Sequence, residues 1–78
     1  METYSNFSGR SGVAAYEISS DSITVQFKDA AVYLYNYGSA GSSAIEQMKV
    51  LAKRGIGLNS YISTTVKEKY AAKLRSRR

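Results

Sequence analysis

The sequence predicts an α+β fold, βββαα, in which a three-stranded antiparallel meander is followed by two helices packed on one sheet face. The prediction depends on a change of hydrophobic period: alternate residues are apolar across residues 13–37, whereas apolar residues recur at helical spacing across 43–54 and 59–74. A chain of 78 residues also has room for one core only, because chains of this size bury only about 60 to 65% of their unfolded surface.

The middle strand has the clearest pattern, because its apolar residues alternate with polar ones, as in a strand buried on one face. These apolar residues are Ile23, Val25 and Phe27. Residues 13–18 precede it across a turn rich in serine, and residues 32–37 follow it after a short reversal at 29–31. We therefore expect the three segments to pair in chain order through hairpins.

The first helix is predicted between two local signals. Ser43 and Glu46 fit a capping box, in which each side chain bonds a free backbone N–H of the first turn. Gly55 stands where a left-handed residue ends a helix. One arc of the helix is apolar and consists of Ala44, Ile45, Met48, Leu51 and Ala52. Val50 falls outside that arc, so we expect it to be exposed.

The second helix is predicted to begin at Asn59, a good capping residue, after the flexible residues 55–57. Its apolar ladder at i, i+4 spacing is Ile62, Val66, Tyr70 and Leu74. Lys69 and Lys73 lie beside this ladder, and long basic side chains can cover apolar surface while their charges stay in water. We therefore expect the helix to pack on one flank only.

The domain organisation follows from composition. Residues 1–12 are polar and rich in serine and glycine, without the pattern of a signal peptide, and we expect a flexible N-terminal lead-in. Residues 13–75 form the single predicted domain, and 76–78 a basic tail. No stretch approaches the roughly 18 apolar residues of a membrane span. Together with the absence of cysteine, these features favour a cytoplasmic setting.

The formal charge of +5 is unevenly distributed. Residues 1–48 carry two basic side chains against five carboxylates, hence −3, whereas residues 49–78 carry nine basic side chains against Glu68 alone, hence +8. Such asymmetry points to an anionic partner, nucleic acid before membrane. The alternative is a solvated basic face that ends in an unstructured tail.

Several kinds of chemistry are disfavoured. The chain has no cysteine and no histidine, so we expect no zinc site and no other cofactor. Its carboxylates are scattered singly, so nothing marks a general acid and base, and we expect a protein that is not an enzyme. Gly55 and Gly57 lack the third glycine and preceding strand of a phosphate-binding loop.

Three segments, "VYLYNYG", "AKRGIGLNSYI" and "KEKY", occur in this order behind a strand hairpin. In this respect the chain resembles the KTSC domain, a family named from the C-terminal extension of some lysyl-tRNA synthetases and also found as separate bacterial proteins. The family's Tyr-x-Tyr pair would fall on Tyr33 and Tyr35. Its later positions would fall on Gly55, Leu58, Asn59, Ile62 and Tyr70. We expect these matched residues to be structural.

The chain departs from that family pattern at two places. Residues 29–31 read Asp-Ala-Ala where family members often have glycine, and Lys53 replaces a frequent serine. The family has no settled activity, so the resemblance implies a fold more than a function. Its link to a tRNA synthetase makes RNA the expected polymer by analogy.

The tyrosines allow two interpretations. They could be a platform on which bases stack, or they could supply area to the core while their hydroxyls stay at its wet rim. We expect Tyr33 and Tyr35 to pack under the helices and Tyr37, at the strand end, to be exposed. Asn59 likewise is either a helix cap or a ligand contact.

The function predicted from these observations is weak binding of RNA or another nucleic acid by the basic C-terminal helices. The expected contact residues are Lys49, Lys53, Arg54, Lys67, Lys69, Lys73, Arg75 and Tyr37. The alternative is a protein-interaction module that docks on an acidic or apolar partner surface. A role at a membrane surface ranks third, and we expect no membrane insertion.

Overall fold

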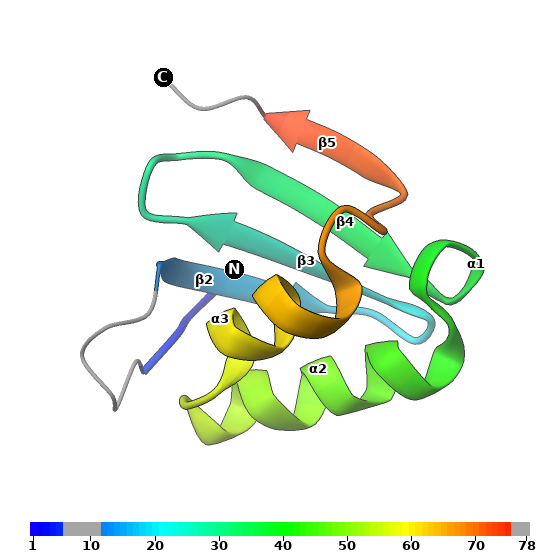
Figure 1. The fold of residues 1–78 in the computed structure, drawn as a ribbon. Coiled ribbons are helices and arrows are strands. Elements are labelled where there is room, and N and C mark those ends of the chain that lie inside the picture. The colour runs from blue at the N-terminus through cyan, green and yellow to red at the C-terminus, as the bar shows by residue number, and fades with distance from the viewer. Residues whose placement is uncertain (6–11, 76–78) are drawn as a thin grey trace.

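The structure is a computed structural model, and it describes residues 1–5 and 12–75. An antiparallel sheet of five strands in chain order is covered by helices on one face (Figure 1). The strands are β1 (Glu2–Thr3), β2 (Val13–Ile18), β3 (Ser22–Phe27), β4 (Val32–Asn36) and β5 (Ala72–Arg75). The helices are α1 (Tyr37–Ala40), α2 (Ser42–Arg54), α3 (Leu58–Tyr61) and the π-helical turn η1 (Ile62–Val66).

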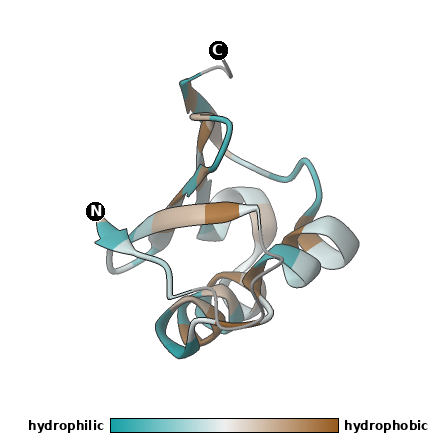
Figure 2. Cartoon of the chain, turned by 90° about the vertical axis from the view of Figure 1, so that its left-hand side faces the viewer, coloured by the Kyte–Doolittle hydropathy of each residue, from teal (hydrophilic) through white to brown (hydrophobic). Residues whose placement is uncertain are grey.

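The α+β class and the meander β2–β3–β4 are confirmed, whereas the predicted total of three strands and two helices is wrong. Val25 pairs with Tyr16 on one side and Tyr33 on the other, and Ile23 pairs with Tyr35. Directly paired residues share a face of the sheet, so these side chains all point toward the helices. Figure 2 shows the helices together on that one side of the sheet.

Helix α2 confirms the predicted apolar arc. Ile45, Met48 and Ala52 are buried, whereas Val50 is 48% exposed. Gly55 ends the helix with φ 76°, the left-handed conformation that glycine adopts without steric cost. The helix therefore packs on the sheet through the face that its sequence predicts.

The predicted capping box is wrong. Helix α2 begins at Ser42 after Gly41, without a side-chain cap, and Glu46 instead bonds Tyr37. A capping box does form one helix earlier: Asn36 Oδ1 accepts from the Ser39 N–H, and Ser39 Oγ accepts from the Asn36 N–H. The meander strand therefore ends at Asn36, because its last residue caps α1.

The second predicted helix is also wrong over its C-terminal half. Helix α3 starts at Leu58 after Gly57, so Asn59 lies inside the helix and is not its cap. The helical chain ends after η1, where Lys67 adopts φ 45° and ψ −114°. From there the chain turns back and pairs with β4 as β5. Leu58, Ile62 and Val66 are buried as predicted, but Leu74 is 57% exposed.

The expected N-terminal lead-in contributes to the domain in its described part. Strand β1 pairs with β2, and Tyr4 is buried in the core. The Tyr4 hydroxyl accepts a hydrogen bond of 3.2 Å from the Leu58 N–H, a free donor at the start of α3. Packing therefore begins before residue 13. The rest of the lead-in, residues 6–11, and the predicted tail, 76–78, lie outside the described residues.

Candidate functional site

Four aromatic rings gather on the helix-covered face where β3, β4 and the segment before β5 meet. The Tyr33 ring lies 4.8 Å from that of Tyr70, centroid to centroid, and 5.6 Å from that of Phe27, edge to face. Tyr70 also meets Tyr35 edge-on at 6.2 Å. The contacts of Tyr70 hold the chain after η1 against the sheet, which positions β5 beside β4.

The tyrosines differ in burial along β4. Tyr35 is 1% exposed, and burial raises its pKa to about 12, with smaller contributions from Tyr33 and Tyr70. Tyr33 is half-buried at the margin of the core, and Tyr37 is 39% exposed. Tyr35 therefore lies in the core as predicted, and Tyr37 is exposed as predicted. Of the three tyrosines, Tyr33 is the one that contacts both the core and solvent.

Beside Tyr33 an open pocket of about 430 Å³ forms at one end of the sheet. Phe27 and Tyr33 wall it, and the turn between β3 and β4 makes its rim. The complete lining is Gly12, Phe27, Lys28, Asp29, Ala31 and Tyr33. Aromatic walls with a few polar groups at the rim are typical of a small-molecule binding site.

The turn is fixed by its own hydrogen bonds. The Phe27 N–H donates to Ala31 O at 2.8 Å, and the Ala30 N–H donates to Phe27 O at 2.9 Å. Asp29 Oδ1 accepts from the Ala31 N–H at 3.1 Å. Ala30 has φ 76°, unusual for a residue with a Cβ. These bonds hold the rim of the pocket in one shape.

Two lysines and the carboxylate of Asp29 lie beside the aromatic surface. Lys28 lies in its lining, and Lys73 places Nζ 5.6 Å from the centroid of the Tyr33 ring, a cation–π contact. The side chain of Asn59, predicted as a cap, lies near Gly12 of the pocket lining. A Cβ atom added to Gly12 would lie 3.5 Å from Asn59 Oδ1. The site thus combines aromatic surface with cations.

Lys49, a predicted nucleic-acid contact, has its ammonium group bonded within the fold. Its Nζ donates to Ser20 O at 2.8 Å and to Glu46 at 2.9 Å, and it lies 5.7 Å from the centroid of the Tyr37 ring. The Lys49 hydrogen bond, ahead of that from Tyr37, lowers the pKa of Glu46, and the bond to Glu46 raises the pKa of Tyr37. This cluster fastens α2 to the turn between β2 and β3.

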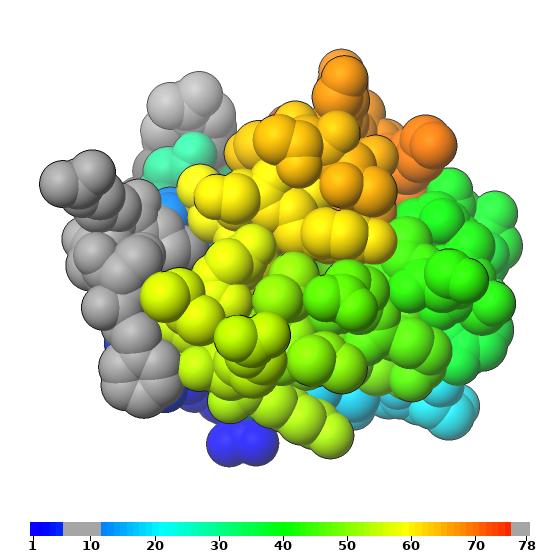
Figure 3. Space-filling model, turned by 60° about the horizontal axis from the view of Figure 1, so that its bottom comes forward, coloured from blue at the N-terminus to red at the C-terminus, as the bar shows by residue number. Residues whose placement is uncertain are grey.

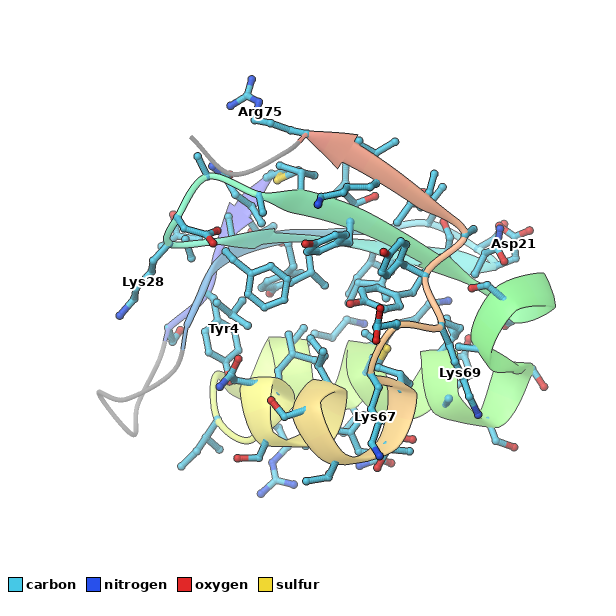
Figure 4. All side chains as sticks on the ribbon, turned by 45° about the horizontal axis from the view of Figure 1, so that its top comes forward. Tyr4, Asp21, Lys28, Lys67, Lys69 and Arg75 are labelled. Atoms are coloured by element: carbon cyan, nitrogen blue, oxygen red, sulfur yellow. The ribbon has the colours of Figure 1, made fainter. Side chains whose placement is uncertain are left out.

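The other predicted contacts do not share one helix face. Lys53 and Arg54 lie in the last turn of α2, which crosses the helical side in Figure 3 with α3 and η1 beside it. Lys67 and Lys69 follow η1, and Figure 4 shows them directed to the helical side, whereas Arg75 extends from the far end of β5. Lys73 and Arg75, which were expected on a second basic helix, therefore lie on a strand.

Phe27 and Lys28 are site residues that the sequence reasoning missed. Phe27 was taken for an ordinary core position of the middle strand, and it is only half-buried. One signal was present in the sequence: "FKDAAVY" places an aromatic and a basic residue on the turn that leads to Tyr33. The fold brings together Lys73, which was predicted as a contact, with Tyr33 and Tyr70, which were predicted as structural.

Within residues 1–5 and 12–75, no group of acidic or other ligating side chains could hold a metal ion. No helix in that part of the chain is long and apolar enough to cross a membrane.

Comparison with known proteins yielded no relative. No family model matches the chain, and no match was found among curated proteins or among solved structures.

Proposed function

We propose that the protein is a non-enzymatic module that binds single-stranded nucleic acid weakly, RNA first, with one base against Phe27 and Tyr33. The observation that carries the proposal is the pocket of about 430 Å³ with two aromatic walls and a lysine at its rim. A base stacked on an aromatic side chain contributes roughly 1 to 3 kcal/mol. The preference for RNA, like membership of the KTSC family, is proposed from the sequence resemblance.

The cations near the pocket supply the remaining affinity. Lys28 lines the pocket, and Lys73 lies against the ring of Tyr33. Contacts of lysine or arginine with phosphates release counterions, so the affinity falls with salt. If these two lysines each neutralise one phosphate of a single strand, log affinity should fall against log salt with a slope of about −1.4.

The test is a fluorescence anisotropy titration of a labelled single-stranded RNA at low salt and then at increasing salt. Phe27→Leu keeps apolar volume but removes the ring, and we expect about tenfold weaker binding. Lys28→Ala should make the salt slope shallower by about 0.7. Lys53→Ala is the matched control, because Lys53 lines neither pocket. We expect this variant to keep the salt slope of the wild-type protein.

Two results would overturn the proposal. One is no binding of single-stranded RNA or DNA at low salt by a protein whose thermal unfolding shows that it is folded. The other is binding that Lys53→Ala weakens as much as Lys28→Ala, and that Phe27→Leu leaves unchanged, because the contact surface would then be elsewhere.

A further inference from the structure

Strand β5 is an edge of the sheet. Among the described residues it pairs with β4 and with no further strand. Figure 1 shows it at the border of the sheet farthest from α2. An edge strand carries a row of backbone N–H and C=O groups that another chain can pair with. The backbone of β5 therefore offers a place for one more strand.

The side chains of this edge are basic on both faces of the sheet. Lys73 pairs with Tyr33 and so lies on the helix-covered face, whereas Arg75 pairs with Val32 and lies on the uncovered face. Neither forms an ion pair with the residues that the structure describes, where the only two pairs involve Met1 with Glu17 and Lys49 with Glu46. The edge therefore presents unneutralised positive charge on either side of an added strand.

An apolar patch continues the edge onto the uncovered face. Leu74 is 57% exposed and Met1 is 56% exposed. Both line a shallow pocket of about 280 Å³ together with Val32, and Arg75 stands at its margin. Val32 pairs with Arg75 and Tyr33 pairs with Lys73, so Leu74 is an extra residue in β5. This β-bulge places Leu74 and Arg75 on the same side. A strand added to β5 could bury an apolar side chain here.

We propose that β5 docks an extended acidic segment of another protein, which adds to the sheet as a further strand. Backbone pairing would supply affinity, and carboxylates beside Lys73 and Arg75 would supply selectivity. Charge decides against a second copy of this chain as the occupant. Two β5 strands side by side would bring Lys73 and Arg75 of one copy close to those of the other, and like charges on neighbouring strands destabilise the pair.

The probe is a capped peptide of alternating glutamate and valine, titrated while the amide signals of the protein are followed by NMR. We expect shifts and slowed amide exchange over residues 72–75. A glutamate and valine peptide methylated on every backbone nitrogen has the same charge but no N–H to donate to the ladder, so we expect about tenfold weaker binding. An alternating lysine and valine peptide should bind as weakly, because it would repel both cations.

Charge reversal tests the selectivity. The double variant Lys73→Glu/Arg75→Glu should prefer the lysine and valine peptide over the glutamate and valine peptide, by about tenfold. The matched control Lys53→Glu/Arg54→Glu on α2 changes net charge equally and should keep the wild-type preference. Thermal unfolding of both variants shows whether each is folded. Slowed amide exchange over residues 72–75 of the wild-type protein tests the same docking site without any substitution.

Three outcomes would overturn the proposal. The first is equal binding of the methylated and the unmethylated glutamate and valine peptides, because charge alone and not strand pairing would then supply the affinity. The second is peptide-induced shifts on α2 with none on β5. The third is a dimer of the free protein in which the amides of β5 are already protected, because a second copy would then occupy the edge.

Discussion

Replacing Ala30 by glycine should stabilise the protein, although glycine substitutions generally destabilise. Ala30 has φ 76°, whereas its neighbour Ala31 has no positive φ and is 3% exposed. The same substitution at two adjacent positions of one turn should therefore act in opposite directions. The neighbouring variant Ala31→Gly is the matched control.

The two effects can be estimated separately. The left-handed conformation costs a residue with a Cβ about 1 to 2 kcal/mol of conformational free energy. Ala30→Gly removes that strain. Against it stand about 0.4 to 1 kcal/mol for the greater freedom of glycine in the unfolded chain and a few tenths for a half-buried methyl. We expect a net stabilisation of roughly 0.5 kcal/mol. Ala31→Gly relieves no strain and loses a buried methyl, so we expect a destabilisation of roughly 1 to 2 kcal/mol.

Chemical denaturation with urea, followed by circular dichroism, measures both free energies of unfolding. The difference between the variants should be about 2 kcal/mol, which corresponds to roughly 8 to 16 °C in Tm for a domain of this size. If Ala30→Gly destabilises the protein as much as Ala31→Gly does, the left-handed turn is absent and the rim of the pocket has another shape.

Three further predictions concern the N-terminus, the core and the surface. Tyr4→Phe should cost about 1 to 2 kcal/mol in urea denaturation, since it leaves the buried Leu58 N–H without its acceptor; an unchanged midpoint would mean that residues 1–5 are not packed. Since the folded pKa of Tyr35 is about 12 and the ordinary value is 10, the unfolded chain loses its proton first as pH rises. Stability present below pH 10 should therefore fall by roughly 2 to 3 kcal/mol between pH 10 and pH 12, and Tyr35→Phe should make that fall shallower; an equal fall in the variant would contradict the assignment. Lys49→Ala should lower Tm, because Lys49 bonds Ser20 O, yet leave the salt slope of RNA binding unchanged; a shallower slope would restore Lys49 as a phosphate contact.

Local sequence patterns correctly predicted those elements in which the spacing of apolar residues within one short segment determines which face is buried. In β3 the alternation of apolar and polar residues places Ile23 and Val25 in the core, and in α2 the helical spacing places Ile45 and Met48 there. Gly55 ends α2 because its left-handed conformation depends on its own backbone. Such features carry their signal in one short stretch of chain.

The candidate site could be predicted only in part. Tyr33 was recognised from its alternation with other tyrosines, but its partner Phe27 comes from a neighbouring strand and Lys73 from the far end of the chain. Which side chains share a face follows from the register, Val25 opposite Tyr33 and Tyr33 opposite Lys73. Register depends on contacts between strands, which no single segment displays.

By itself, the sequence determined the α+β class, the three-stranded meander, α2 and the concentration of positive charge in the C-terminal half. Tertiary structure alone decided the fate of residues 67–75, "KEKYAAKLR", whose alanine, lysine and leucine favour a helix by propensity. There the left-handed Lys67 ends the helix, Tyr70 packs on Tyr33 and Tyr35, and the remainder pairs with β4 as β5. Contacts made across the fold outweigh helix propensities of less than about 1 kcal/mol per residue, so an expected basic helix is a basic sheet edge.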